Sequence, residues 1–284
     1  MRDQHRSFTS DLVAAMRAFY SETPADLDVA SDPVASSLLP LPLTLLVRAV
    51  GRPGLARLVH HALGSASFGL SYGVPLRTAA IDAELRSEAA SGCEQLVLLG
   101  AGLDARAFRL PELAECAVYE LDHPATQAYK QRRVGSLEPL AKSVEFCSID
   151  FERQSIGEVL GGAGFSTQRK SFWVWEGVTM YLTPGAIDAT LDAVALYSAP
   201  GSTLCMTYVT PERGLVRRAG LISARQIGEP ILGSLSQAEV KDRLERRGFS
   251  VLSDTDANDW ARRHWPDSRL RVRLWERLVV ARRA

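Results

Sequence analysis

The pattern of apolar and polar residues changes near residue 76. Beyond it, short runs of almost continuous apolar residues alternate with segments of helical periodicity, as expected for parallel strands that helices cover on both faces. The runs predicted to be strands are 95–100, 116–121, 144–149, 172–176, 202–208, 249–253 and 271–281. The chain is therefore predicted to have an α/β fold with a doubly wound, mostly parallel, seven-stranded sheet.

The segments between these strands carry signals for helix ends. Helices are predicted over 104–110, 123–134, 152–160 and 184–197. Thr183 and Pro184 are suited to cap and open the last of these helices. A capping box of Ser236 and Glu239 predicts another helix before the sixth strand. Arginines alternate with apolar residues in the last predicted strand, which favours an edge position for part of it.

The N-terminal part of the chain has a different pattern, with short helical segments interrupted by proline and glycine. These segments lie at 11–20, 43–50 and 55–63. We predict an N-terminal helical cap over residues 1–75 and a core over 76–284. Within the core, residues 209–235 fit neither pattern and are predicted to form a lid-like insertion over the carboxyl ends of the strands, where open α/β sheets bind ligands.

Composition and charge are those of an ordinary globular protein. Apolar residues make up 46% of the 284 residues and charged residues 23%, and 33 basic residues balance 33 acidic ones. This balance argues against a nucleic-acid-binding protein and against a protein held to an anionic membrane by charge. No apolar run is long enough to span a membrane and the first residues resemble no secretion signal, so we expect a cytoplasmic protein.

Four cysteines are scattered along the sequence without a Cys-x-x-Cys pair. We expect reduced, buried thiols rather than a disulfide framework. The four are Cys93, Cys116, Cys147 and Cys205.

The loop after the first predicted strand is the most informative segment. Gly100 and Gly102 allow a sharp turn close to a ligand, and Ala105 is small enough for close helix packing. Asp122 follows about 20 residues later, at the end of the second strand. This spacing matches the dinucleotide-binding fingerprint and predicts, as one alternative, an NAD(P)-dependent oxidoreductase.

Asp104 argues against a dinucleotide at this loop. A dinucleotide places its pyrophosphate at the helix N-terminus, where a carboxylate would repel it. The same carboxylate suits a cationic ligand, and it can also cap the helix, so the two roles are compatible. We therefore favour an adenosine-bearing ligand that has no phosphate.

Acidic residues also follow the second and third predicted strands. Glu120 and Asp122 are two residues apart and face the same side of a strand, where they can accept hydrogen bonds from ribose hydroxyls. Asp150 and Phe151 follow the third strand. There the carboxylate can accept from an adenine amino group and the ring can stack on the base.

Glu176 and Arg77 add opposite charges to this edge, because Glu176 follows the fourth strand and Arg77 precedes the first. A carboxylate stabilises an ammonium or a sulfonium where water is partly excluded, and an arginine pairs with a carboxylate in a forked geometry. These residues outline adenosine joined to a positively charged amino acid. S-adenosylmethionine has this shape.

These segments resemble the S-adenosylmethionine-dependent leucine carboxyl methyltransferase family, including its bacterial relatives that O-methylate polyketides. The matching segments are 74–78, 98–106, 119–124 continuing to Lys130, 149–151 and 175–182, within roughly residues 70–210. The resemblance implies a class I methyltransferase fold, which is Rossmann-like. The cofactor contacts that it implies are Arg77, Gly100, Asp122, Asp150, Phe151 and Glu176, to which the chemistry of the residues adds Gly102, Asp104 and Glu120.

The predicted function is an S-adenosylmethionine-dependent O-methyltransferase for a small, mostly apolar acceptor, either a polyketide hydroxyl or a carboxylate. Tyr181, just beyond Glu176, is predicted to line the acceptor pocket. A binding protein that has kept the fold and lost turnover is a third alternative. We expect no metal, no nucleic acid and no membrane partner, and the sequence leaves a homodimer open.

No residue is assigned as a catalytic base. A carboxylate acceptor is ionised at neutral pH and needs no base, whereas a phenol, with a pKa of about 10, would gain from one. The histidines considered, each expected to have a structural role, are His60, His61, His123 and His264.

Overall fold

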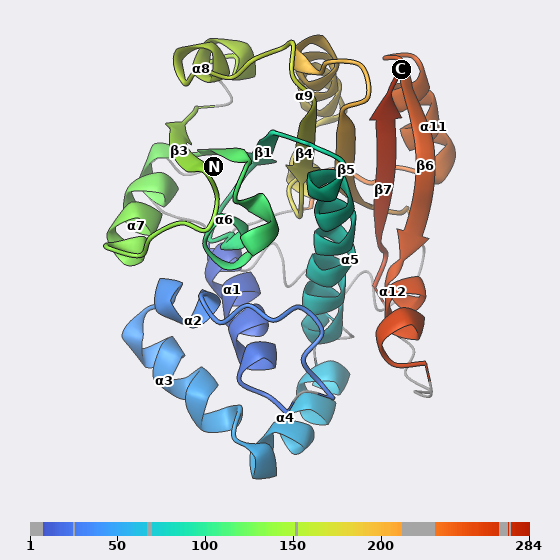
Figure 1. The fold of residues 1–284 in the computed structure, drawn as a ribbon. Helices are drawn as coiled ribbons and strands as arrows, with labels where there is room; N and C mark the ends of the chain where they lie inside the picture. Colours follow the sequence, from blue (N-terminus) through green and yellow to red (C-terminus); the bar gives the residue numbers. More distant parts are fainter. Residues whose placement is uncertain are drawn as a thin grey trace.

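The computed structural model describes residues 8–24, 26–66, 70–150, 153–211, 231–266, 272 and 274–284. Its centre is a seven-stranded sheet with the order β3-β2-β1-β4-β5-β7-β6 (Figure 1). The strands are β1 (Gln95–Leu99), β2 (Ala117–Asp122), β3 (Ser143–Ser148), β4 (Ser171–Trp175), β5 (Thr203–Val209), β6 (Phe249–Asp256) and β7 (Glu276–Arg283). Only β7 runs antiparallel to its neighbours, so the predicted fold class is confirmed.

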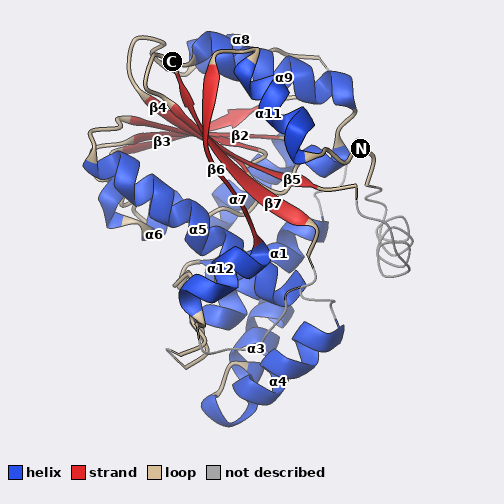
Figure 2. Cartoon of the chain, turned by 90° about the vertical axis from the view of Figure 1, so that its right-hand side faces the viewer, coloured by secondary structure: helices blue, strands red, loops and turns tan. Residues whose placement is uncertain are grey.

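Helices cover both faces of the sheet (Figure 2). One face carries α8 (Ile156–Gly162), α9 (Pro184–Tyr197) and α11 (Gln237–Glu245). The other carries α5 (Leu70–Ala90), α6 (Arg106–Arg109), α7 (Pro124–Val134) and α12 (Ala257–His264). The N-terminal helices extend from this second face and are α1 (Phe8–Ser21), α2 (Ala35–Leu38), α3 (Leu41–Val50) and α4 (Pro53–Ala66). Two short 3₁₀ helices, η1 (Pro111–Leu113) and η2 (Thr179–Tyr181), lie in loops.

The strands are continuously apolar because both of their faces are buried. In β1, Leu96 and Leu98 belong to the core cluster beneath α5, whereas Val97 and Leu99 belong to the cluster beneath α9. This alternation is the ordinary period of two of a strand. No helix among the described residues is long and apolar enough to cross a membrane.

The predicted helix starts agree with the structure. Thr183 caps α9 by accepting a hydrogen bond from the backbone of Ala186 at 3.3 Å, and Ser236 and Glu239 form the expected capping box of α11. All four cysteines are free and buried, as expected. The predicted insertion over 209–235 lies largely outside the described residues, since 212–230 are not described.

The prediction of an edge position for part of the last strand is wrong for β7, which lies between β5 and β6. Two of its three arginines are neutralised by acids of neighbouring elements and therefore do not require an open edge. Arg277 donates to Asp254 of β6 at 2.8 Å, and Arg282 pairs with Glu88 of α5.

The hydrophobic pattern does not predict α5, which spans 21 residues and contains Pro75. Residues 71–82 of this helix are all buried, so this stretch has no solvent-exposed polar face and no amphipathic stripe to detect. The predicted boundary between cap and core lies inside α5. Side chains from the N-terminal helices and from the sheet also share one core cluster, which contains Ala14 and Leu38 together with Leu96.

Candidate functional site

The glycine loop between β1 and α6 lies at the carboxyl end of β1. Gly100 and Gly102 have φ values of +69° and +51°, in the left-handed region that favours glycine. A Cβ on Gly100 would lie 2.6 Å from Cγ2 of Val178, so a side chain does not fit there. The backbone N–H of Gly100 donates to the carbonyl of Leu121 at 2.9 Å, which ties the loop to β2.

Asp122 lies against this loop, at the end of β2. Its Oδ2 accepts a hydrogen bond from the backbone of Gly102 at 2.5 Å, and its Oδ1 accepts one from the backbone of His123 at 2.6 Å. Burial raises the pKa of the Asp122 carboxyl, although these hydrogen bonds oppose the shift. The predicted proximity of the glycines and the strand-end acid is thus present in the fold.

Glu120 is fully buried on the same side of β2 as Asp122. Its Oε2 pairs with the ammonium of Lys130 on α7, whereas its Oε1 has no hydrogen-bond partner among the described residues. Burial raises the pKa of Glu120 to about 7, against the opposing charge of Lys130. A buried acceptor oxygen without a partner is costly, and a donor hydroxyl would satisfy it.

The N-cap of α6 is Ala105, which has no side-chain capping hydrogen bond, so the structure does not give Asp104 the N-cap role that the sequence allows. Asp104 instead binds the first residue of this helix. It accepts a hydrogen bond from the backbone of Arg106 at 2.7 Å and pairs with the guanidinium of the same residue. Burial alone would raise the pKa of Asp104, but the charges of Arg106 and Lys130 outweigh it and the pKa is lowered. A contact between this carboxylate and a cationic ligand stays a prediction.

Arg77 and Glu176, which are predicted to face opposite charges of one ligand, bind each other. Arg77 Nε donates to Glu176 Oε1 at 2.8 Å, and Arg77 Nη1 donates to the carboxylate of Glu276 at 2.7 Å. Glu176 Oε2 lies 2.9 Å from Nη1 of Arg106. Burial would raise the pKa of Glu176, but Arg77 and Arg106 outweigh it and lower the pKa to about 2.

These pairs belong to a larger buried network that runs from β7 to α1. Arg106 Nε donates to Asp82 of α5 at 2.7 Å, and Asp82 also lies 2.7 Å from Nη2 of Arg109. Asp32 then connects Arg109 to Arg17 of α1, at 3.5 Å and 2.9 Å. Finally, Arg17 donates to the carbonyl of Leu103 in the glycine loop at 2.6 Å. The network joins the N-terminal helices, the loop and the sheet.

Sequence reasoning missed most of this network. Glu276 is 199 positions from Arg77, and nothing in either segment indicates that they meet. Arg17, Asp32 and Asp82 likewise lie in segments with no local signal. Arg106 and Lys130 lie in the segments that match the family, close in sequence to the predicted acids. Their positive charges were a detectable sign that these acids are paired within the protein.

Three other predicted site residues lie outside the buried network. Asp150 follows β3 with its carboxylate 37% exposed and 3.5 Å from Arg153 Nε. Tyr181 ends η2 and is half-buried. Phe151 lies outside the described residues. Their contacts with cofactor or acceptor stay predictions.

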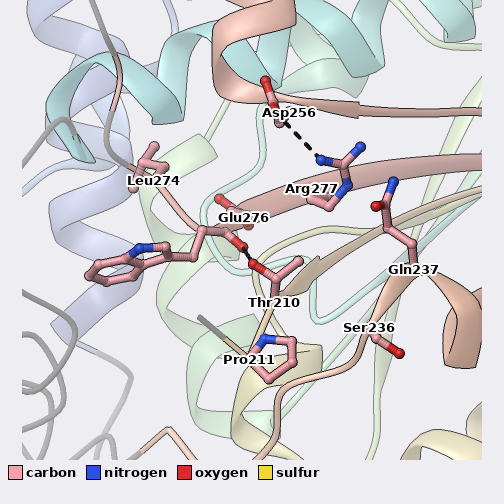
Figure 3. Close-up of a pocket in the computed structure, with 9 residues that line it drawn as sticks. Thr210, Pro211, Ser236, Gln237, Asp256, Leu274, Glu276 and Arg277 are labelled. Atoms are coloured by element: carbon pink, nitrogen blue, oxygen red, sulfur yellow. Dashed lines mark hydrogen bonds and ion pairs between the residues drawn. The ribbon is translucent and has the colours of Figure 1, made fainter. Parts of the chain in front are cut away.

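A cavity of about 330 Å³ opens at the carboxyl ends of β5 and β6, beside the start of β7 (Figure 3). Its wall combines apolar Pro211, Leu274 and Trp275 with polar and charged side chains. The latter are Thr210, Ser236, Gln237, Asp256, Glu276 and Arg277. Glu276 therefore belongs both to the cavity and to the buried network, through its ion pair with Arg77.

Comparison with known proteins assigns the family. The family model of leucine carboxyl methyltransferases matches residues 11–195. A relative from Mycolicibacterium gilvum, named "Putative S-adenosyl-L-methionine-dependent methyltransferase", is 34% identical over 277 residues, covering 89% of this chain and 85% of the relative. A relative of the same name from Mycobacterium avium is 36% identical over 265 residues, covering 88% and 84%.

This chain belongs to the leucine carboxyl methyltransferase family. The predicted family is confirmed, and S-adenosylmethionine is the cofactor, as predicted. The choice between the two cofactors that the glycine loop allowed is thereby decided against a nicotinamide dinucleotide.

Solved structures confirm the fold. A methyltransferase-like protein from Thermobifida fusca has a TM-score of 0.57 at 17% identity and covers 82% of this chain and 90% of that one. A protein of the DUF574 family from Streptomyces avermitilis has a TM-score of 0.59 at 13% identity, with 82% and 92% covered.

The residues of the carboxyl edge fit an adenosine-bearing cofactor. Oε1 of Glu120 is a buried acceptor that lacks a hydrogen-bond donor among the described residues. Asp122 holds its carboxylate between the loop and α7. Ribose hydroxyls are donors of the kind that Glu120 and Asp122 would accept.

The histidines have structural surroundings in this family member. His123 caps α7, since its Nδ1 accepts a hydrogen bond from the backbone of Ala125. His60 is buried, forms a hydrogen bond with the hydroxyl of Tyr20 and has a pKa lowered to about 4, chiefly by burial. His264 lies in the last turn of α12. Among the described residues, no group of three or more His, Cys, Asp or Glu side chains is arranged to hold a metal ion.

Proposed function

We propose that this methyltransferase transfers a methyl group to a hydroxyl or carboxylate oxygen of a small, mostly apolar acceptor in the cytoplasm. The observation that carries the proposal is the cavity at the carboxyl ends of β5 and β6. Its apolar residues suit the body of such an acceptor, and its hydroxyl, amide and guanidinium groups suit an oxygen-bearing end. A polyketide and a carboxylic acid both have this composition.

Glu276 supports a link between acceptor and cofactor. It lines the cavity and binds Arg77, which in turn binds Glu176. S-adenosylmethionine supplies an already activated methyl group when it is bound. The residues of this chain then need only exclude water and orient the acceptor, and orientation can contribute several of the roughly 7–11 kcal/mol available to well-placed reactants.

A carboxylate acceptor agrees best with the absence of an assigned base. It is already ionised at neutral pH, whereas a phenol with a pKa of about 10 would require a proton acceptor. Arg277 of the cavity wall could pair with a carboxylate, although it already donates to Asp254 at 2.8 Å. A phenolic acceptor would instead favour Tyr181 as a partner for the hydroxyl.

The cofactor half of the proposal is tested by calorimetry with S-adenosylhomocysteine. We expect Asp122→Ala to weaken binding by about 1–3 kcal/mol, because a buried hydrogen-bonding carboxylate is lost. Asp192→Ala is the matched control, since the Asp192 carboxylate on α9 is 67% exposed and pairs with Arg247. Equal affinities for the two variants would contradict the placement of the ribose at Asp122.

The acceptor half is tested by methyl transfer to a panel of carboxylic acids, phenols and aliphatic alcohols. Gln237→Leu removes an amide from the cavity wall and should raise the KM for the acceptor without changing S-adenosylhomocysteine affinity. Cofactor binding with no transfer to any acceptor would favour the alternative of a non-catalytic binding protein. Transfer only to nitrogen or sulfur nucleophiles would overturn the proposed oxygen acceptor.

A further inference from the structure

Helix α3 exposes three of its four leucines, whereas Leu43 is half-buried against the core. Leu41, Leu45 and Leu46 are 66%, 57% and 56% exposed. The fully buried positions of this helix are instead Thr44 and Val47. An ordinary surface helix turns its apolar stripe toward the core and a polar face toward solvent, whereas α3 has apolar residues on both sides.

Helix α4 has the same arrangement. Leu55, Leu58 and Leu63 are all more than one third exposed, and Leu58 reaches 67%. The residues that α4 buries are Ala56, His60 and Gly64, which contribute little apolar surface, and Val59 is half-buried against the core. The two helices are consecutive, so their leucines form one feature, which we call the outer face of the α3–α4 hairpin.

The α3–α4 hairpin forms one end of the molecule. Figures 1 and 2 both show α3 and α4 at the end opposite α8 and α9, with the sheet between. Six of the exposed large hydrophobic residues gather in this hairpin. Monomeric proteins rarely expose apolar patches of more than a few hundred Å² unless the patch contacts a partner or a membrane.

The charge of this region is also one-sided. Residues 33–81 contain no aspartate and no glutamate, whereas the hairpin contains Arg48, Arg52 and Arg57. Arg48 and Arg57 are 61% and 63% exposed, and their ion-pair partners among the described residues are Glu22 and Asp26, at 3.8 Å and 3.1 Å. The neutral balance of the whole chain therefore conceals a local basic surface around the leucines.

We propose that the outer face of the α3–α4 hairpin docks onto an anionic lipid bilayer. Leucines would enter the boundary between headgroups and acyl chains while the arginines contact lipid phosphates, the arrangement of helices that lie in a membrane interface. A second copy of this chain fits less well, because face-to-face pairing would bring two sets of arginines together with no acid in either hairpin to pair them. This inference is independent of the methyl acceptor.

The experiment is co-sedimentation of the full chain with vesicles. One set contains phosphatidylcholine alone and the other contains phosphatidylcholine with phosphatidylglycerol. We expect binding to the anionic vesicles, weaker binding to the neutral ones, and a loss of binding as salt is raised. No sedimentation with the anionic vesicles would overturn the proposal.

Two variants test the surface itself. The double variant Leu45→Gln with Leu58→Gln should lower the partition coefficient about tenfold or more, since two leucines no longer enter the apolar boundary. Arg52→Glu, at the exposed turn between the helices, should lower binding to anionic vesicles several-fold but not to neutral ones. This second variant keeps the test decisive if the double variant fails to fold.

Leu196→Gln is the matched control, because Leu196 is 73% exposed on α9 at the other end of the molecule. It should bind vesicles like the unaltered chain. Equal binding by the control and by the leucine double variant would contradict the proposed face. Light scattering could instead show a dimer that Leu45→Gln dissociates. This result would show that a second copy of the chain covers the outer face of the α3–α4 hairpin.

Discussion

The carboxyl edge of the sheet and the α3–α4 hairpin depart from the usual distribution of residues in opposite directions. At the carboxyl edge, Arg106 and Asp82 are charged and almost completely buried, at 1% and 0% exposure. In the hairpin, Leu58 is apolar and 67% exposed. A buried charge is tolerated only where it has a partner of opposite charge. An exposed leucine needs no partner for the chain to fold.

This difference predicts how each region responds to substitution. The buried network joins six separate segments of the chain, so the loss of one member leaves other charges buried and unpaired. The leucines of the hairpin are exposed both before and after folding, so replacing them changes the free energy of unfolding little. The carboxyl edge should therefore be sensitive and the hairpin tolerant.

The largest effect is expected for Arg106→Met. This change removes the partner that Asp82, Asp104 and Glu176 share, and should lower the free energy of unfolding by about 3–5 kcal/mol. Urea denaturation measures the loss. Arg86→Met is the control, since its pair with Glu112 is exposed and should contribute less than about 1 kcal/mol. Similar losses of unfolding free energy in the two variants would show that burial does not determine how much an ion pair contributes.

Glu176→Gln should produce a smaller, pH-dependent loss. The pKa of Glu176 in the folded chain is lowered from 4.5 to about 2, so its contribution to stability is present above pH 4.5 and is lost as the pH falls toward 2. At pH 7 the variant should be less stable by about 3 kcal/mol. Denaturation at pH 7, 5 and 3.5 measures the difference, which must shrink at the lowest pH. A constant difference would contradict the ion pairs.

The next largest effect is expected for Gly100→Ala, which should lower the free energy of unfolding by about 1–3 kcal/mol. The residue has a φ of +69°, and its new Cβ would lie 2.6 Å from the stiff side chain of Val178. Because the glycine loop borders the cofactor edge, affinity for S-adenosylhomocysteine should fall as well. Thermal unfolding and calorimetry measure the two effects. An unchanged affinity would place the cofactor away from this loop.

The smallest effect is expected in the hairpin, where Gly54→Ala should stabilise the chain by about 0.4–1 kcal/mol. Gly54 lies in the first turn of α4, and a Cβ there meets nothing within 4 Å. Alanine restricts the unfolded chain without straining the folded one. A higher midpoint of thermal unfolding would confirm the tolerance of this region, and a clear loss would show that the turn is closely packed.

The fold was largely predictable because strand, loop and cap signals are local. The apolar runs identify all strands, and Thr183 and Ser236 mark helix starts at their own positions. The contact between Gly102 and Asp122 was also predictable, since parallel neighbouring strands bring their carboxyl ends to one edge. Helix α5 was missed because its buried stretch has no solvent-exposed polar face.

The partners of the site residues were not predictable. Arg77 was expected to be available to a ligand, but it is shared between Glu176 and Glu276, and Glu276 is brought to it by β7. The last strand was expected to tolerate its arginines at an edge, but Asp254 of β6 neutralises Arg277 inside the sheet. Both outcomes depend on contacts between segments far apart along the chain.

The sequence by itself determined the α/β class, the positions of the strands along the chain, the glycine loop and the family, because each depends on spacing within short segments. Only the tertiary structure decided which charges are neutralised, that β7 is internal, and that six leucines of α3 and α4 are exposed. The physical reason is that burial and ion pairing depend on which surfaces meet in space. The periodicity of one segment shows which of its faces is apolar but not which other segment packs against that face.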